Sequence, residues 1–185
     1  MARTRAAVAD AVRTLFAEEG WDAVTHQRIA ERSGLGRNTV YRHFPDRTAL
    51  LLHAGHFNQV HHAPRTGDLR TDLIAELTTF RHELFDGIVG NVMAAMVERA
   101  DHDPEIGPMR DALVEAGARQ TIDIVEEAVA AGRMTDAVSV RDLVAALCGP
   151  AVYARLCTGD PPSDAAIEHL VDTHLAPLAP GRPGD

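Results

Sequence analysis

The chain has 185 residues, of which 45% are hydrophobic and only 4% aromatic, and its net charge is −9. This length allows one large domain or a small domain joined to a medium one, and the abundance of Ala, Val and Leu favours helices. No apolar run approaches the ~18 residues that span a bilayer, and the basic start lacks the apolar stretch of a signal peptide. We therefore expect a cytoplasmic protein without a membrane partner.

Charge is distributed unevenly along the chain. Residues 1–50 contain eight Arg and six acidic residues, a net charge of +2, whereas residues 51–185 contain ten Arg and 21 acidic residues, a net charge of −11. A basic head on an acidic body favours binding of an acidic partner, such as nucleic acid, by the head.

The first predicted helix runs from about Ala6 to Glu19. Apolar residues recur there at i, i+4, i+7 and i+8 and form one stripe: Val8, Val12, Leu15 and Phe16. Gly20 is a natural end for this helix, and the hydroxyl of Thr25 can cap the next one.

Three further helices are predicted close together. The second covers about 26–33 and ends at Gly34, and the third covers about 36–44 and is stopped by Pro45. The fourth covers roughly 47–60. The short lengths and close spacing of these helices are typical of a small helical domain.

The rest of the chain is also predicted to be helical, because no stretch of useful length alternates as a β-strand does. After a break at 61–68, helices are expected at about 69–86, 88–100, 105–131, 140–157 and 163–175. The tail, 177–185, is rich in Pro and Gly and is expected to be frayed. The predicted fold class is all-α.

Residues 25–47 fit the requirements of a helix-turn-helix. Ala30 is the small residue where two helices cross, and Gly34 tolerates positive φ in the turn. Apolar residues can lock the second helix onto the first: Ile29, Leu35, Val40 and Phe44. The other positions of the second helix are polar or amphipathic and are expected to face outward, as in a helix that enters a major groove: Arg37, Asn38, Thr39, Tyr41, Arg42 and His43.

The same segment, THQRIAERSGLGRNTVYRHFPDR, resembles the DNA-binding signature of the TetR family of transcriptional regulators, T-x-x-x-I-A-x-x-x-G-x-x-x-x-T-x-Y-x-H-F. The resemblance covers about the first 55 residues, and the remainder is similar only in length, helicity and layout. It implies an N-terminal three-helix DNA-binding domain at 1–46 and a helical effector-binding and dimerisation domain at 47–185. The helix at 47–61 would connect them.

The resemblance also implies roles for individual residues. Four residues should hold DNA phosphates: Thr25, Tyr41, His43 and Arg47. Three should reach base edges from the start of the recognition helix, Arg37, Asn38 and Thr39, while Arg28 would reach a neighbouring base. Arg3 and Arg5 could form an arm along the backbone or minor groove. Family members often have lysine where Arg47 stands, and Arg keeps the charge with a different geometry.

A single head of this kind reads only a few base pairs, so the motif implies a dimer on a palindromic operator. Between Val140 and Leu156 nearly every residue is apolar, so this helix must be covered on more than one side. By resemblance, the last two helices form a four-helix bundle across the dimer, with these residues at the interface: Leu147, Ala151, Ala154, Ile167, Leu170 and Val171. A single buried helix in a monomer is the alternative. Pro150 is expected to bend this helix.

An effector pocket is expected among the helices spanning 69–131. Its candidate residues are His56, Phe80, Phe85, Val89, Met93, Met96, Met109 and Leu113, although the same residue types are equally common in plain cores. A mostly apolar lining would suit an apolar or amphipathic small molecule.

No metal, cofactor or catalytic site is predicted. His53 and His56 are i, i+3, but few carboxylates and no Cys accompany them. Cys148 and Cys157 would point to opposite faces of one helix, which disfavours a disulfide. Phosphate-loop and hydrolase motifs are missing from the sequence.

We therefore expect a one-component regulator, a repressor rather than an activator, whose partners are operator DNA, a small-molecule effector and a second copy of the chain. Effector binding would change the separation of the two recognition helices. Two alternatives remain open: an architectural DNA-binding protein without an effector, and a small helical enzyme.

Overall fold

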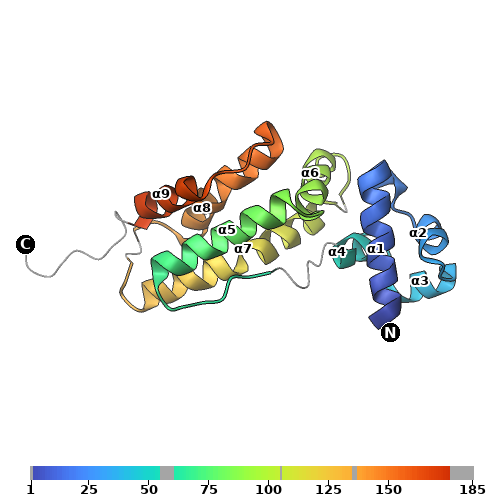
Figure 1. Ribbon diagram of the computed structural model, residues 1–185, viewed down its shortest axis with the longest axis horizontal. Helices are drawn as coiled ribbons and strands as arrows, with labels where there is room; N and C mark the ends of the chain where they lie inside the picture. The colour runs from blue at the N-terminus through green and yellow to red at the C-terminus, as the bar shows by residue number, and fades with distance from the viewer. Residues whose placement is uncertain (1, 55–60, 105, 135–136, 176–185) are drawn as a thin grey trace, which may run out of the picture. The chain divides into compact units, whose positions relative to one another are not determined.

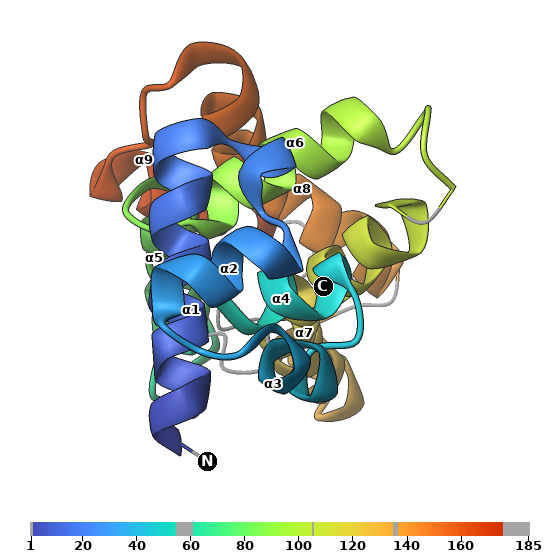
Figure 2. The ribbon, with the colours of Figure 1, turned by 90° about the vertical axis from the view of Figure 1, so that its right-hand side faces the viewer.

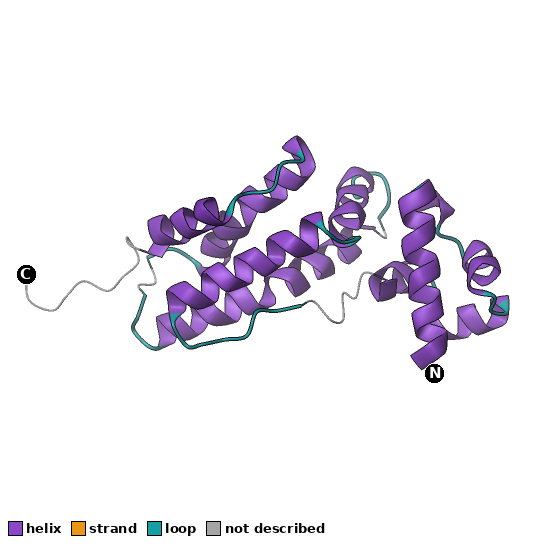
Figure 3. Cartoon of the chain, viewed as in Figure 1, coloured by secondary structure: helices purple, strands orange, loops and turns teal. Residues whose placement is uncertain are grey.

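The computed structural model describes residues 2–54, 61–104, 106–134 and 137–175, and all regular structure within them is helical (Figure 3). Its contacts divide the chain into two compact units. The head unit comprises residues 1–60 and 87–116, and the body unit comprises residues 61–86 and 117–185. Within the described ranges, no helix is long and apolar enough to cross a membrane. The predicted all-α fold is confirmed.

The head unit is built around helix α1, Ala2–Glu19. Helices α2, His26–Ser33, and α4, Arg47–Ala54, pack against α1, and the short α3, Arg37–His43, packs on α2 (Figures 1 and 2). The four apolar residues of the predicted stripe on α1 are buried: Val8, Val12, Leu15 and Phe16. The stripe therefore forms the centre against which the other helices pack.

The head unit also contains α6, Val89–Arg99, and the first part of α7, Ile106–Ala130. Arg99, at the end of α6, donates a hydrogen bond to Oδ2 of Asp22 at 3.1 Å. Its guanidinium also lies 5.9 Å from the centre of the Trp21 ring. These contacts attach the end of α6 to the short 3₁₀ turn Trp21–Ala23, which follows α1.

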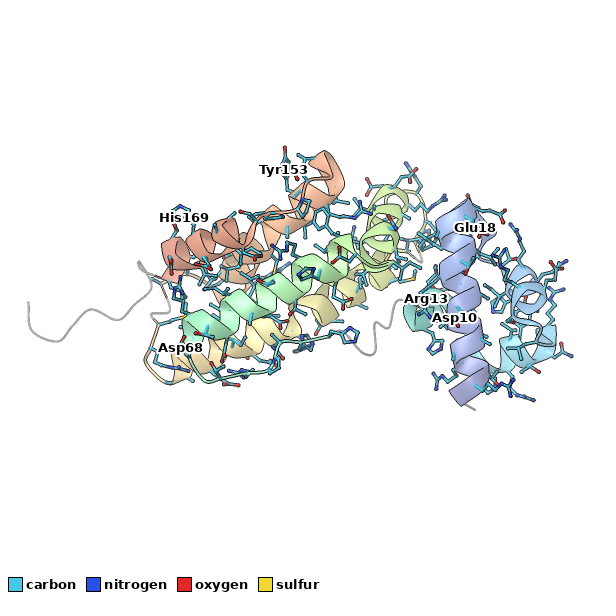
Figure 4. The ribbon with its side chains drawn as sticks, in the orientation of Figure 1. Asp10, Arg13, Glu18, Asp68, Tyr153 and His169 are labelled. Carbon is cyan, nitrogen blue, oxygen red and sulfur yellow. The ribbon has the colours of Figure 1, made fainter. Side chains whose placement is uncertain are left out.

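The body unit consists of α5, Leu69–Phe85, the rest of α7, α8, Val140–Tyr153, and α9, Asp164–Leu175. Helix α5 packs on α8 and α9. Its start is capped by Asp68 (Figure 4), whose carboxylate accepts the N–H of Thr71 at 2.8 Å. The core joins side chains from all four helices: Leu73, Leu77, Ile124, Val125, Ala128, Leu143, Leu147, Ile167 and Val171.

The helix predicted at 140–157 is divided in the structure. Helix α8 continues through Pro150, and a π-helical turn, Ala154–Thr158, follows it and ends at Gly159, where φ is 75°. The irregularity therefore lies after Pro150, which lacks the N–H that a regular ladder uses. The predicted tail, 177–185, lies outside the described residues.

The break predicted at 61–68 is a loop held by a buried carboxylate. Asp72 is 2% exposed, and it accepts hydrogen bonds from the N–H and the hydroxyl of Thr66, both at 2.7 Å, and from the N–H of Gly67 at 3.0 Å. Burial by itself raises the pKa of Asp72, but these hydrogen bonds outweigh burial and hold the pKa below its ordinary value. The loop is thus fastened to α5 by an ionised side chain.

A second buried carboxylate, Glu76, holds the beginning of the same loop. It accepts the N–H of Ala63 at 3.0 Å, Nδ1 of His62 at 2.8 Å and Nε2 of Gln120 at 2.8 Å. Because Gln120 lies on α7, this group joins the loop to two helices of the body unit.

Candidate nucleic-acid interface

Helices α2 and α3 of the helix-turn-helix are held together by a cap, a tight turn and a small apolar core. Thr25 caps α2, since its hydroxyl oxygen accepts the N–H of Arg28 at 3.3 Å, and Gly34 ends α2 with φ at 70°. Ile29, Val40 and Phe44 are buried, at 0%, 0% and 2% exposure. The predicted apolar lock between α2 and α3 is therefore present, with Leu35 half-buried beside it.

Helix α3 presents a polar surface to solvent. Arg37, Asn38, Tyr41 and Arg42 are exposed, and Thr39 and His43 are half-buried, whereas Val40 is the buried residue of this helix. This surface carries both guanidinium groups and an amide, which are the groups that pair with guanine and adenine edges in a major groove. All six residues predicted to face outward thus retain accessible surface.

Two polar groups of this surface are ordered by a neighbouring ring that the sequence analysis did not identify. The ring of His26 stacks on that of Tyr41, with 3.9 Å between ring centres. The guanidinium of Arg37 lies 5.5 Å from the Tyr41 ring centre. The local sequence pattern does not predict the stacking of His26 on Tyr41, because the two residues lie on different helices.

Arg28 is placed differently from its predicted role at a neighbouring base. Its guanidinium forms a two-point ion pair with the carboxylate of Glu19 on α1, and the Nη1–Oε2 distance is 2.6 Å. The hydrogen bond from Arg28 lowers the pKa of Glu19, and the same bond raises the pKa of Arg28. A base contact would require Arg28 to leave Glu19. Breaking this ion pair costs little free energy, because both side chains are exposed.

The Arg47 side chain is half-buried against the turn that follows α1. Its guanidinium donates to the backbone carbonyl of Trp21, lies 3.6 Å from Oδ1 of Asp22, and sits 5.3 Å from the centre of the Trp21 ring. Burial lowers the pKa of Arg47. In this structure the residue fastens the start of α4 to the turn after α1. Its contact with a DNA phosphate stays a prediction.

Arg3 and Arg5 do not form an extended arm. Both are exposed residues of α1, which begins at Ala2 instead of the predicted Ala6. The guanidinium of Arg5 lies 6.0 Å from the Phe44 ring centre, and the carbonyl of Arg5 bonds to Nε2 of His53 at 2.9 Å. Arg and Ala are good helix formers, so the basic start extends the helix.

The residues predicted to line an effector pocket are distributed over both units. In the body unit, Phe80 and Phe85 are half-buried on α5. In the head unit, Val89 is half-buried and the others are buried: Met93, Met96, Met109 and Leu113. His56 lies outside the described residues. The pocket remains a prediction.

A cavity of about 260 Å³ lies instead within the body unit, between α5, α8 and α9. Its lining is mostly apolar and includes Leu77, Leu147, Pro150, Ala151, Ile167 and Leu170. Four of these residues were expected at a dimer interface: Leu147, Ala151, Ile167 and Leu170. The cavity shows that α8 and α9 leave apolar surface uncovered by the chain itself.

Most of the residues expected at a dimer interface are buried within the body unit of the single chain. Leu147, Ile167 and Val171 are 1%, 4% and 0% exposed, and Ala151 and Ala154 are each 8% exposed, while Leu170 is half-buried. Side chains that the body core already covers offer almost no surface to a second copy. The accessible side chains of this region are others, including Tyr153 and His169, which project outward in Figure 4.

Among the described residues, no group of three or more His, Cys, Asp or Glu side chains is arranged to hold a metal ion. His61 and His62 pair with carboxylates, Glu83 and Glu76, at 2.8 Å each. Cys148 and Cys157 are free thiols.

Comparison with known proteins assigns both parts of the chain. Residues 8–54 match the family of bacterial regulatory proteins called the tetR family, and residues 63–174 match the tetracyclin repressor-like C-terminal domain. The chain is 23% identical to the HTH-type transcriptional regulator YdeS of Bacillus subtilis over 171 residues, which is 91% of this chain and 86% of that protein. It is 25% identical to the HTH-type transcriptional regulator Rv1556 of Mycobacterium tuberculosis over 166 residues, 88% of this chain and 81% of that protein.

A solved structure agrees with these matches. The TetR family transcription regulator SCO0332 superposes with a TM-score of 0.74 at 27% identity, covering 96% of this chain and 100% of that one. These relatives are regulators and not enzymes. Since the C-terminal match alone spans more than half of the chain and the N-terminal match contains α2 and α3, the chain belongs to the TetR family of helix-turn-helix, DNA-binding transcriptional regulators.

Proposed function

We propose that this chain is a repressor that binds a palindromic operator as a homodimer and is released by a small-molecule effector. The observation that carries the proposal is the exposed polar surface of α3 on a closed helix-turn-helix core. Arg37, Asn38 and Thr39 would contact base edges. Because the target is DNA, the regulator would act in the cytoplasm.

Phosphate contacts would come from the residues that surround this base-reading set: Thr25, Tyr41, Arg42 and His43. Thr25 uses only an oxygen lone pair to cap α2, so its hydroxyl hydrogen stays available to a phosphate oxygen. Arg47 is left out of the set, because it is bound to the carbonyl of Trp21.

The body unit supports the dimer. Exposed residues follow one face of α8 and its continuation, Ala146, Pro150, Tyr153 and Leu156, of which Tyr153 is 64% exposed and Leu156 38%. The apolar cavity between α8 and α9 opens beside them. A second copy that packs on these helices would cover this surface and place two heads on two half-sites.

Release by an effector would follow from the spacing of the half-sites. Two recognition helices must lie about one helical turn of DNA apart, ~34–36 Å, so a small change in their separation prevents simultaneous docking. An effector shifts this equilibrium only by its different affinity for the two forms of the dimer. The predicted pocket residues Met93, Met96 and Met109 favour an apolar or amphipathic effector.

The first test is selection of bound DNA from a random-sequence pool at physiological salt. Recovery of a palindrome with two half-sites is expected. Recovery of DNA without an enriched sequence would instead support an architectural protein that binds any duplex.

Two substitutions then separate base contacts from phosphate contacts on the selected operator. Arg37→Ala should relax base preference at one position by about 1–3 kcal/mol. Arg42→Ala should weaken binding to every sequence, and it should reduce by about 1 the slope of the logarithm of the binding constant against the logarithm of the salt concentration. Equal and negligible effects of both substitutions would contradict the proposed interface.

The dimer is tested by Tyr153→Glu, which places a charge on the exposed face of α8. Sedimentation velocity should show a dimer for the unmodified chain and a monomer for this variant. Val138→Glu is the matched control, since Val138 is 44% exposed but precedes α8. A monomeric unmodified chain, or dissociation of both variants alike, would contradict this interface.

A further inference from the structure

A histidine of α2 lies directly beneath an exposed tyrosine of the recognition helix. The rings of His26 and Tyr41 are parallel within 1°, and their centres are 3.9 Å apart. His26 is only 9% exposed, whereas Tyr41 is 41% exposed. The buried His26 ring therefore packs against the inner face of the exposed Tyr41 ring.

The orientation of the His26 ring is fixed by a hydrogen bond to the same recognition helix. Its Nε2 lies 2.7 Å from the carbonyl oxygen of Phe44, which is the C-terminal cap of α3. A carbonyl oxygen only accepts, so Nε2 carries the hydrogen and donates it. His26 thus contacts α3 at two points, through a ring face at Tyr41 and through an N–H at Phe44.

Tyr41 in turn holds the side chain of Arg37, four residues earlier on the exposed surface of α3. The Arg37 guanidinium carbon lies 5.5 Å from the centre of the Tyr41 ring, and Nη2 donates to the tyrosine hydroxyl at 3.4 Å. A free arginine side chain samples many rotamers, and ordering it on binding costs free energy. Contact with a ring that is itself stacked on His26 removes part of that cost before DNA binds.

We propose that His26 is a positioning residue that sets the base preference of Arg37 through the ring of Tyr41. This inference rests on the proposed function, in which Arg37 contacts a base. His26 itself is buried, so we expect it to act through Tyr41 and not by its own contact with DNA. Its effect is on the geometry in which the guanidinium is presented, and bidentate pairing with guanine depends on that geometry.

The experiment compares two substitutions of His26 on the operator selected with the unmodified protein. His26→Gln keeps an N–H donor but has no ring, and His26→Phe keeps a ring but has no donor. Binding is measured to the operator and to a variant operator changed only at the base that Arg37→Ala identifies. His26→Gln should lower the ratio of the two affinities about threefold to tenfold, the range expected for loss of one aromatic stack, and His26→Phe should lower it less than about twofold.

Three controls separate positioning from loss of structure. Ile29→Val removes buried volume from the same helix, so it should lower the melting temperature without changing the affinity ratio. In the Arg37→Ala background, His26→Gln should cause no further loss of base preference, because the group it positions is gone. Should His26→Gln fail to fold, Tyr41→Leu removes the same stack from an exposed position and should lower the same ratio.

The outcomes are distinct for the two proposals. A random pool that yields no operator overturns the proposed function and this inference with it. An operator whose Arg37-dependent preference survives in His26→Gln, or is lost equally in His26→Phe, leaves the proposed function standing and overturns the positioning role of His26.

Discussion

The loop that leads into α5 depends on one buried carboxylate, which makes Asp72→Asn an informative perturbation. Asp72 accepts three hydrogen bonds from Thr66 and Gly67 and is 2% exposed. Asparagine retains one acceptor oxygen, but its amide group faces a backbone N–H, so at least one buried donor loses its partner. Hydrogen bonds to a charged group contribute about 1.5–3 kcal/mol each, so we expect a loss of about 2–4 kcal/mol at neutral pH.

This loss corresponds to a decrease of about 4–16 °C in melting temperature for a chain of this size. Thermal and urea unfolding followed by far-UV circular dichroism would measure it. Asp160→Asn is the matched control, because it removes the same charge from an exposed loop position and should cost less than about 0.5 kcal/mol. Equal losses in the two variants would refute the argument from the buried hydrogen bonds.

The contribution of Asp72 to the stability of the folded chain depends on pH, and the sign of this dependence follows from its pKa. The pKa of Asp72 is lower in the folded chain than its ordinary value, so the folded state favours the ionised form. The stabilisation is present above the unfolded pKa and is lost as the pH falls through the folded pKa. The difference in stability between the unmodified chain and Asp72→Asn should therefore shrink below about pH 4. A difference that stays constant from neutral to acid pH would contradict this explanation.

Three further predictions concern local structure. Gly34 has φ at 70° with no atom within 4 Å of an added Cβ, so Gly34→Ala should cost only backbone strain, about 1–2 kcal/mol in urea unfolding, and Gly34→Asn clearly less. The Ser139 hydroxyl caps α8, since it accepts the N–H of Asp142 at 3.1 Å and donates to Oδ2 of Asp142 at 2.7 Å. Ser139→Ala should therefore cost about 0.5–2 kcal/mol, and Ser139→Thr, which keeps the hydroxyl, should restore most of it. Burial raises the pKa of the Cys148 thiol to about 12, whereas Cys157 is exposed. Iodoacetamide at about pH 8 should therefore add one label to the native chain and two in urea, as counted by mass spectrometry; two labels on the native chain would contradict the burial of Cys148.

Features that depend on near neighbours could be predicted from the sequence. The spacing of Val8, Val12 and Leu15 defines a buried face of α1, the hydroxyl of Thr25 caps α2, and Gly34 ends it, as the structure shows. Each of these features is decided within one or two helical turns, where side-chain period and backbone preference act directly. For the same reason the bounds of α2 and α5–α9 were predicted to within a few residues, and the TetR-like signature identified the family.

Contacts between distant residues were decided only by the tertiary structure. Arg28 pairs with Glu19, Arg47 binds the carbonyl of Trp21, and His26 stacks under Tyr41. Local periodicity shows which face of a helix is polar, but it does not show which neighbouring element that face meets. The same holds for apolar residues. The sequence pattern shows that the apolar side chains of α8 and α9 must be covered, but only the packed structure shows which of them lie in the body core and which stay exposed.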